Sequence, residues 1–214
     1  MSDRRLTPEL LLGAYASGIF PMAETRDDPE VYWVDPQYRG ILPLDGLHLS
    51  RSLARRMRQG EVTATLDVAF DEIVDGCAAR DETWINDTIR DLMSQLYVAG
   101  YAHAFGVWRG NSLIGGMYGL TIGGAFFGES MFSAATDGSK MTLAFAVDHL
   151  RRTGFTLFDT QFLTPHLASL GAVEIPRAAY HKRLAEALSR PADIHAIPLE
   201  TDPQAVVQRI TQTS

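Results

Sequence analysis

The sequence predicts an α+β fold in which a mixed β-sheet is flanked by helices, and three observations support this prediction. First, two-residue and 3.6-residue hydrophobic periods follow one another in the order β-β-β-α-β-α-β over residues 101–190. Second, glycine-containing turns at 109–112 and 123–124 join the first three strands as hairpins. Third, 46% hydrophobic and 21% charged residues indicate an ordinary globular chain with one large core or two unequal domains.

The N-terminal part is predicted to form a small domain. A Thr-Pro pair at 7–8 predicts the N-cap and first residue of a helix that Gly18 ends. Residues 19–43 hold four prolines without a sustained period, which predicts loops and short extended pieces. We therefore expect a reduced N-terminal domain, residues 1–35, followed by a main domain, residues 36–214.

The main domain alternates between helices and strands. Before the hairpins we expect a helix after Ser50, a strand at 61–70, a short helix at 71–79 and a helix from 86 to 100. The hairpin strands are followed by five further elements: a helix at 139–154, a strand at 155–162, a helix from Thr164-Pro165 to Gly171, a strand at 172–175, and a last helix at 177–188. This order is similar to that of the GNAT acyltransferase superfamily, a likeness of fold that fixes no chemistry.

The charge pattern leaves nucleic-acid binding open. A formal net charge of -7 argues mildly against a general nucleic-acid binder, because phosphate contacts need local positive charge. One segment is locally basic: in a helix capped by Ser50, Arg51, Arg55 and Arg58 share a face. Taken alone, this is a solvated amphipathic face; the alternative is a ridge that contacts phosphates.

Other function classes lack their sequence signals. No run approaches the ~18 apolar residues of a membrane helix, and no apolar stretch of a signal peptide follows the first residues. The single cysteine, Cys77, is expected in the core of a cytoplasmic protein. There is no Walker A loop, no Rossmann glycine pattern and no Cys/His set with metal spacing, and the six histidines are scattered singly. We therefore expect no cofactor, no metal and no membrane partner.

Two acids lie in apolar, β-prone runs, where a buried carboxylate is costly unless a partner pairs with it. Glu129 lies in "GGAFFGESMFS" and Asp159 in "LFDTQF". The two-residue period of a strand puts Asp159 and Gln161 on one face. Either both acids face water at strand ends, or they line a pocket with the amide. The surrounding aromatic residues favour the pocket.

At these residues the sequence closely resembles a known family. The segments "GIFPM", "HLSRS", "DETWI", "GGMYG", "FGESMFS" and "DTQFLTPHLASLGAVEIPR" are similar, in the same order, to those of leucyl/phenylalanyl-tRNA–protein transferases. That family transfers Leu or Phe from aminoacyl-tRNA to the N-terminal Arg or Lys of a protein, which marks it for degradation. Members often have a further N-terminal extension, so the N-terminal domain is expected to be truncated.

The resemblance implies roles for individual residues. Gln161 holds the acceptor amine, Asp159 polarises that contact, and Glu129 is a pocket acid suited to a cationic N-terminal residue. The donor side-chain pocket is formed by Met117, Phe126, Gly128, Leu143, Leu150 and Phe158. Contacts to tRNA come from Trp84, from the Arg51, Arg55 and Arg58 face, and from Met22, where the family usually has tryptophan. The implied partners are Leu-, Phe- and Met-tRNA and proteins with N-terminal Arg or Lys, with the enzyme a bacterial cytoplasmic monomer.

Two rival functions follow from the same residues. A GNAT N-acetyltransferase would bind acetyl-CoA through a Q/R-x-x-G-x-G/A turn before the central helix, but here that segment reads "SAATDGSK". A non-catalytic binder of N-terminal degradation signals would use Glu129 and Asp159 alone. That reading leaves the arginine face and the apolar pocket unexplained.

Overall fold

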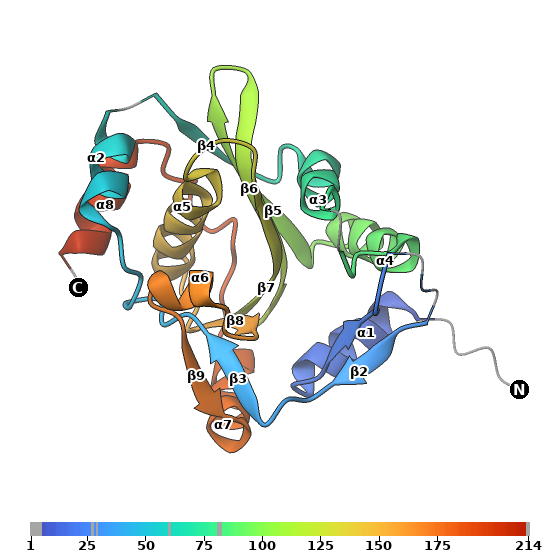
Figure 1. Ribbon diagram of the computed structural model, residues 1–214. Helices are drawn as coiled ribbons and strands as arrows, with labels where there is room; N and C mark the ends of the chain where they lie inside the picture. The colour runs from blue at the N-terminus through green and yellow to red at the C-terminus, as the bar shows by residue number, and fades with distance from the viewer. Residues whose placement is uncertain (1–5, 27, 29, 60, 81–82, 213–214) are drawn as a thin grey trace, which may run out of the picture.

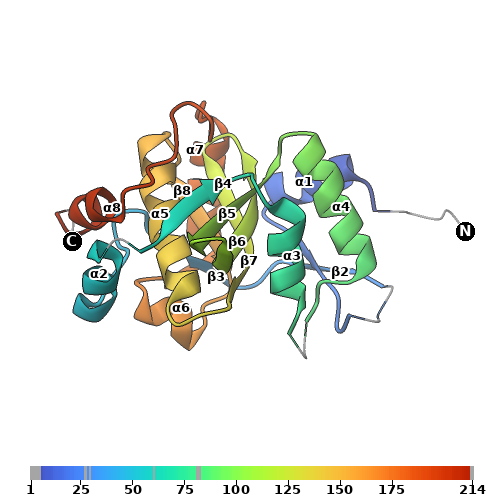
Figure 2. The ribbon, with the colours of Figure 1, turned by 90° about the horizontal axis from the view of Figure 1, so that it is seen from above.

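A seven-stranded sheet runs through the centre of the molecule and carries helices on both faces (Figures 1 and 2). The computed structural model describes residues 6–26, 28, 30–59, 61–80 and 83–212. One face of the sheet is covered by α2 (Arg51–Arg58), α5 (Gly138–Arg152) and α8 (Pro203–Thr211). The other face is covered by α1 (Pro8–Ala16), α3 (Phe70–Ala78) and α4 (Asp87–Val98). No helix in the described part of the chain has the length and apolar character needed to cross a membrane.

The strand order of the main sheet is β4-β5-β6-β7-β8-β3-β9, and only the β7–β8 pair is parallel. The strands are β4 (Thr63–Leu66), β5 (Ala102–Arg109), β6 (Ser112–Ile122), β7 (Ala125–Ser133), β8 (Leu157–Gln161), β3 (Tyr38–Ile41) and β9 (Val173–Pro176). Two further helices, the short α6 (Pro165–Ser169) and α7 (Arg177–Leu188), follow β8 and β9. A separate two-stranded sheet pairs β1 (Phe20–Met22) with β2 (Tyr32–Val34). The predicted mixed sheet flanked by helices is confirmed.

Several helix starts that the sequence predicts are confirmed by capping hydrogen bonds. The Thr7, Ser50 and Thr164 hydroxyls accept from the backbone N–H three residues on, each at 3.2 Å. The Asn86 side chain accepts from Ile89 at 2.8 Å in the same way. These local bonds satisfy N–H groups that have no partner inside the helix, so they can be read from a few adjacent residues.

Two features of the fold differ from the prediction. β3, which lies in the proline-containing segment expected to be loops and short extended pieces, joins the main sheet between β8 and β9. Its four residues carry no period, and its partners lie more than a hundred positions away in the chain. The helix at 177–188 is also not the last, because α8 follows it. Asp202 caps α8 by accepting from Gln204 at 2.9 Å, a signal that sequence reasoning missed.

The N-terminal segment has no core of its own. Leu11, Tyr15 and Phe20 belong to the same buried cluster as the α3- and α4-facing side of the main sheet. Cys77 is buried in that cluster, as expected. The chain passes from the two-stranded sheet to the main sheet between β2 and β3, where the domain boundary was expected. The division at 35/36 stays a prediction, and residues 1–5, 27 and 29 lie outside the described part.

A β-bulge interrupts the pairing of β6 with β7. Tyr118 lies opposite Ser130, and Gly119 lies opposite Gly128, so Glu129 has no partner residue in β6. A bulge of this kind locally bends the strand and changes the direction of a side chain. The bulge requires a close approach of the two strands at Gly119, where an added Cβ would lie 2.3 Å from the Phe127 carbonyl oxygen.

We expect Gly119→Ala to destabilise the protein, because the added methyl group meets backbone rather than a movable side chain. The free energy of unfolding, measured by urea denaturation, should fall by about 1–3 kcal/mol. The matched control is Gly13→Ala in α1, where an added Cβ has nothing within 4 Å. That change should raise stability by about 0.5–1 kcal/mol through helix propensity. A Gly119→Ala protein as stable as wild type would contradict this account of the bulge.

Candidate active site

A cavity of about 370 Å³ opens where β7 and β8 part from each other. The two strands pair only between residues 125–127 and 157–159, and their pairing ends there, while β3 pairs with the opposite edge of β8. The cavity is therefore a product of the topology. Its lining residues come from β1, the loop between α3 and α4, β6, β7, α5, β8 and the α6 region: Phe20, Pro21, Met22, Arg80, Trp84, Met117, Gly128, Glu129, Ser130, Met131, Leu143, Phe158, Thr160, Gln161, Phe162, Thr164, His166 and Leu167.

Glu129 is the one acid among the described residues that line this cavity. Its half-buried carboxylate accepts a hydrogen bond from the Tyr15 hydroxyl at 2.7 Å and one from the Gln161 amide at 3.3 Å. The pKa of Glu129 is raised to about 8, chiefly by burial; the Tyr15 hydrogen bond and the Arg39 charge oppose the shift, and the nearby Asp159 charge adds to it. The bulge thus holds a carboxylate that changes its charge near neutral pH.

Asp159 lies behind the cavity rather than in its lining. Its fully buried carboxylate accepts two hydrogen bonds from Arg39, at 2.9 and 2.6 Å, and one from the Tyr180 hydroxyl at 2.7 Å. The Arg39 guanidinium also donates to the Gly18 carbonyl at 2.9 Å and stacks between the rings of Phe20 and Tyr180. A buried ion pair is tolerated when its geometry is bidentate and when its other hydrogen-bonding atoms also have partners, as they do here.

Gln161 is held by this ion pair. Asp159 Oδ1 accepts from the Gln161 backbone N–H at 2.8 Å, and Gln161 adopts a φ of 58°, which is uncommon for a residue with a side chain. The carboxylate therefore acts on the backbone of Gln161, and it does not polarise the side-chain amide directly as the sequence reading had it. Because that amide donates to Glu129, its carbonyl oxygen is the atom suited to accept from a substrate N–H.

The expected apolar pocket is only partly formed by the residues that the sequence indicated. Met117, Gly128, Leu143 and Phe158 line the cavity. Phe126 and Leu150 do not, because both are fully buried in the core on the α5 side of the sheet. Phe126 packs edge-on against Phe158 at a ring-centre distance of 5.0 Å, so it supports the lining from behind. The sequence does not distinguish the residues that line the cavity from the core residues behind them, because both groups are apolar and fit the same strand period and family pattern.

The residues expected to contact tRNA fall into two groups. Met22 and Trp84 line the cavity, whereas the first two residues of "DETWI", 81–82, lie outside the described part of the chain. Arg51, Arg55 and Arg58 are exposed on α2, outside the lining. The neighbouring Arg56 forms an ion pair with Asp137 at 2.7 Å, so it belongs to a different face of α2.

Sequence reasoning missed the residues that hold the acids in place. Tyr15, Arg39 and Tyr180 lie in a buried helix stripe, a short strand without period and another helix stripe, where they carry no local signal. The expectation that the protein binds no metal was based on the lack of a Cys/His set with metal spacing and on histidines scattered singly in the sequence. Within the described lining, the groups able to bind a metal are one carboxylate, Glu129, and one imidazole, His166.

Comparison with known proteins adds an independent result. The family model described as leucyl/phenylalanyl-tRNA protein transferase matches residues 41–185, and the model of that family's N-terminal domain matches residues 4–37. The chain belongs to the leucyl/phenylalanyl-tRNA–protein transferase family. The resemblance predicted from the sequence is thereby confirmed, and the family is one of aminoacyltransferases by name.

Relatives named leucyl/phenylalanyl-tRNA–protein transferase match over nearly the whole chain. One from Cereibacter sphaeroides ATCC 17025 is 61% identical over 214 residues, 100% of both chains. One from Ruegeria pomeroyi is 60% identical over 209 residues, 98% of this chain and 99% of the relative. Among solved structures, FemX is similar with a TM-score of 0.51 and 12% sequence identity, covering 78% of this chain and 66% of that one. The likeness to FemX concerns the fold alone.

We expect Asp159→Ala to destabilise the transferase strongly, because the buried Arg39 guanidinium loses its counter-charge. The loss should be about 3–5 kcal/mol in urea unfolding. The double variant Arg39→Met/Asp159→Leu removes both charges and should recover most of that loss. If the double variant instead lost as much unfolding free energy as the single variants Arg39→Met and Asp159→Leu lose together, the two residues would not be coupled.

Glu129→Gln should stabilise the protein at neutral and alkaline pH. The pKa of Glu129 is about 8 when folded and about 4.5 unfolded, so the folded state binds the extra proton between these values. Wild-type stability relative to Glu129→Gln should therefore fall as pH rises from about 4.5 to 8 and stay level above 8. With about 1.4 kcal/mol for each unit, reduced because the side chain is half-exposed, we expect roughly 2 kcal/mol in all. A pH-independent difference would contradict the raised pKa.

Proposed function

We propose that this transferase moves Leu, Phe or Met from aminoacyl-tRNA to the N-terminal Arg or Lys of acceptor proteins, forming a peptide bond that creates a degradation signal. The observation that carries the acceptor assignment is the single acid of the described cavity lining, Glu129, held by Tyr15 in an otherwise largely apolar cavity. A buried carboxylate is favourable when its opposite charge arrives with the ligand. The family name of the relatives supports the donor assignment.

The reaction is the aminolysis of an ester. The acceptor α-amine attacks the aminoacyl carbonyl carbon, a C–N bond forms, the C–O bond to the tRNA ribose breaks, and the amine proton ends on the ribose oxygen. We assign the carbonyl oxygen of Gln161 to hold the amine and Glu129 to face the cationic acceptor side chain, since the Gln161 amide nitrogen donates to the Glu129 carboxylate at 3.3 Å and places the two side chains next to each other. An α-amino group titrates near ~8, so little help is needed to deprotonate it.

Asp159 has a positioning role in this proposal. It fixes the backbone of Gln161 at 2.8 Å and is itself fixed by Arg39. The donor side chain would occupy the apolar part of the cavity, next to Met117, Leu143 and Phe158. These three side chains offer no hydrogen-bonding group that could select a polar tail, so selection there depends on shape.

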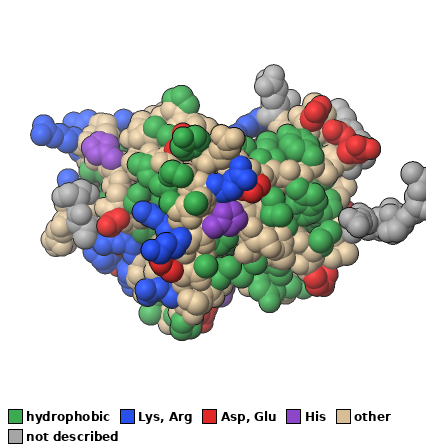
Figure 3. Space-filling view, turned by 90° about the horizontal axis from the view of Figure 1, so that it is seen from below, with side chains coloured by type: hydrophobic (Ala, Val, Ile, Leu, Met, Phe, Trp, Pro, Cys, Tyr) green, Lys and Arg blue, Asp and Glu red, His purple; other side chains and the backbone are tan. Residues whose placement is uncertain are grey.

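The tRNA would run from the cavity toward α2. The cavity is lined by α6 residues, and the end of α6 is joined to the segment before α2 by a hydrogen bond from the His48 N–H to the Leu170 carbonyl at 2.9 Å. Trp84 and Met22 at the cavity are suited to contact the terminal adenosine. Viewed from below, Lys and Arg side chains are more frequent on the left half of the molecule, and hydrophobic side chains are prominent on the right half (Figure 3). We also propose a cytoplasmic, monomeric enzyme.

The decisive experiment offers the protein radiolabelled Leu-tRNA and a peptide that begins with Arg, without ATP. The proposal predicts label on that peptide and little on a matched peptide that begins with Glu. Glu129→Gln should lower transfer to the Arg peptide because the acceptor loses its counter-charge. Acetyl transfer from acetyl-CoA, or peptide binding without transfer, would support the two rival functions and overturn this one.

Donor selection should depend on branching at Cβ. A β-branched residue places a methyl group beside the reacting carbonyl, at the entrance of a cavity that is shaped by packed side chains. One misplaced methyl typically changes discrimination by about 10–200-fold. In competition on one Arg peptide, Leu-, Phe- and Met-tRNA should therefore transfer well and Ile- and Val-tRNA poorly. Equal transfer of Leu and Ile would place the donor pocket elsewhere.

The arginine face should determine the salt dependence of tRNA binding. Arg51→Ala/Arg55→Ala should weaken aminoacyl-tRNA binding and flatten the plot of log K against log salt by about one unit for each lost phosphate contact. The control is Lys182→Ala/Arg183→Ala, which removes two exposed cations from α7. If the slope changed equally in both double variants, the arginines of α2 would be an ordinary solvated face with no specific contact to tRNA.

A further inference from the structure

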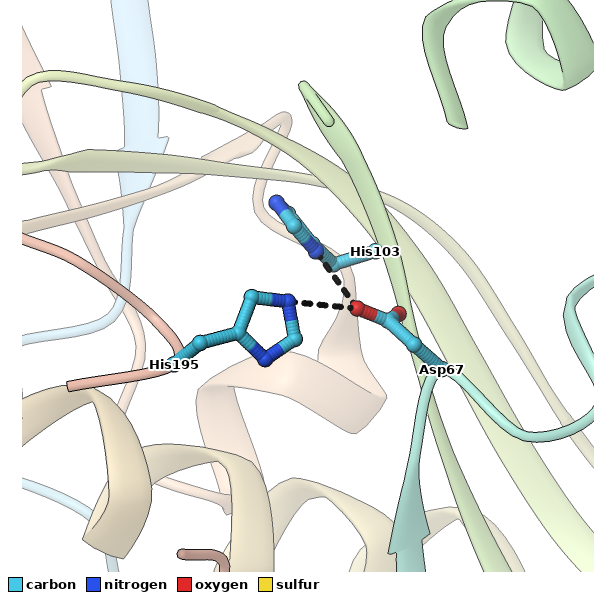
Figure 4. Close-up of side chains that lie close together, drawn as sticks. All are labelled: Asp67, His103 and His195. Carbon is cyan, nitrogen blue, oxygen red and sulfur yellow. Dashed lines mark hydrogen bonds and ion pairs between the residues drawn. The ribbon is translucent and has the colours of Figure 1, made fainter. Parts of the chain in front are cut away.

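Three side chains that are far apart in the sequence meet outside the catalytic cavity (Figure 4). Asp67 follows β4, His103 lies in β5, and His195 lies in the loop between α7 and α8. Asp67 Oδ2 lies 2.7 Å from His103 Nδ1 and 3.2 Å from His195 Nε2. One donor atom from each residue lies within 4.8 Å of the others. The histidines that looked isolated in the sequence are therefore not isolated in the fold.

Two of the three side chains are held rigidly by the protein. Asp67 Oδ1 accepts from the Ala104 N–H at 2.7 Å, and the Asp67 backbone bonds to Ala104 and to the Tyr97 hydroxyl, at 2.8 and 2.9 Å. This fixes a residue whose φ is 58°. His103 is only 3% exposed. A carboxylate oriented by a second hydrogen bond is the usual support of a metal ligand.

His195 closes the group from the solvent side. Its side chain is 59% exposed, but its loop is anchored, because the neighbouring Ile194 carbonyl accepts from His149 Nε2 at 2.6 Å and the His195 N–H donates to Asp193 at 2.8 Å. The solvent side of the group is thus open to a water molecule. Three protein donors and one open position form a four-coordinate set.

We infer that Asp67, His103 and His195 bind a divalent transition-metal ion of the Zn²⁺ class. Two imidazole nitrogens and one carboxylate oxygen suit Zn²⁺ better than Mg²⁺ or Ca²⁺, which prefer sets made of oxygens. In a tetrahedral Zn²⁺ site with bonds of about 2.0–2.1 Å, neighbouring donor atoms lie roughly 3.3 Å apart. The observed 2.7 and 3.2 Å from Asp67 to the two histidines lie near that value, and the two imidazole nitrogens lie within 4.8 Å of each other, so a bound ion would draw the exposed His195 ring inward.

The role of the ion would be structural. It would tie the loop at 189–202 to the β4–β5 edge of the sheet, and that loop leads into α8. α8 is joined to α5 by Arg209, which donates to Asp148 at 2.6 and 2.9 Å. None of the three ligands lines the cavity, so the ion takes no part in the transfer reaction proposed above.

The test uses the full chain without an affinity tag, treated with a chelator and then titrated with ZnCl₂ by calorimetry at pH 7.5. The inference predicts one equivalent of Zn²⁺ bound and no uptake of Mg²⁺. At a hundredfold excess over Kd, Zn²⁺ should raise Tm by roughly 5–10 °C. Metal content and Tm are measured without reference to activity, so failure of the proposed function would leave this result unaffected.

His195→Ala is the first variant, because its exposed side chain can be removed without opening the core. It should weaken Zn²⁺ binding at least 10-fold and, at the same Zn²⁺ concentration, reduce the rise in Tm to about half or less. Asp67→Asn, which keeps the shape of the side chain, should do the same. His48→Ala removes an exposed histidine outside the group and should bind as wild type does. Absence of Zn²⁺ binding in wild type, or binding in His195→Ala and Asp67→Asn that is as tight as in wild type, would overturn the inference.

Discussion

The buried ion pair between Arg39 and Asp159 is the interaction on which the candidate active site depends. Arg39 comes from a four-residue strand, Asp159 from its neighbour in the sheet, and the guanidinium reaches on to the Gly18 carbonyl after α1. One side chain therefore joins the N-terminal segment, β3 and β8. A buried ion pair by itself adds little stability over apolar packing, but losing either member is costly. Its value here is positional, since it fixes the backbone that carries Gln161.

The N-terminal segment and the main sheet form one site together. Tyr15 in α1 donates to Glu129 in β7, and Phe20, Pro21 and Met22 form one wall of the cavity. The segment also shares its buried cluster with the main sheet. An N-terminal piece that looks separable in the sequence is thus part of the cavity. A division into two domains describes the chain order better than it describes the packing.

Local patterns predicted most elements, because helix caps, apolar stripes and hairpin turns involve only neighbouring residues. The position of β3 between β8 and β9 could not be predicted this way, since its pairing depends on contacts over more than a hundred residues. The same limit applies to the site. Glu129 and Gln161 stood out by residue type, whereas Arg39 and Tyr180 carry no signal until the strands are placed. Phe126 and Leu150 were misplaced because two apolar layers share one hydrophobic pattern.

The bulge at Glu129 has a consequence for how this strand can vary. The pairing stays in register on both sides of the extra residue, because Gly128 lies opposite Gly119 and Ser130 lies opposite Tyr118, its neighbour in β6. Ser130 and Met131, which line the cavity just beyond the bulge, therefore keep their direction whether or not the extra residue is present. Deleting Glu129 would restore regular pairing and remove the bulge together with the charge, whereas replacing it would keep the bulge. The strand can thus lose this carboxylate without turning over the cavity residues that follow it.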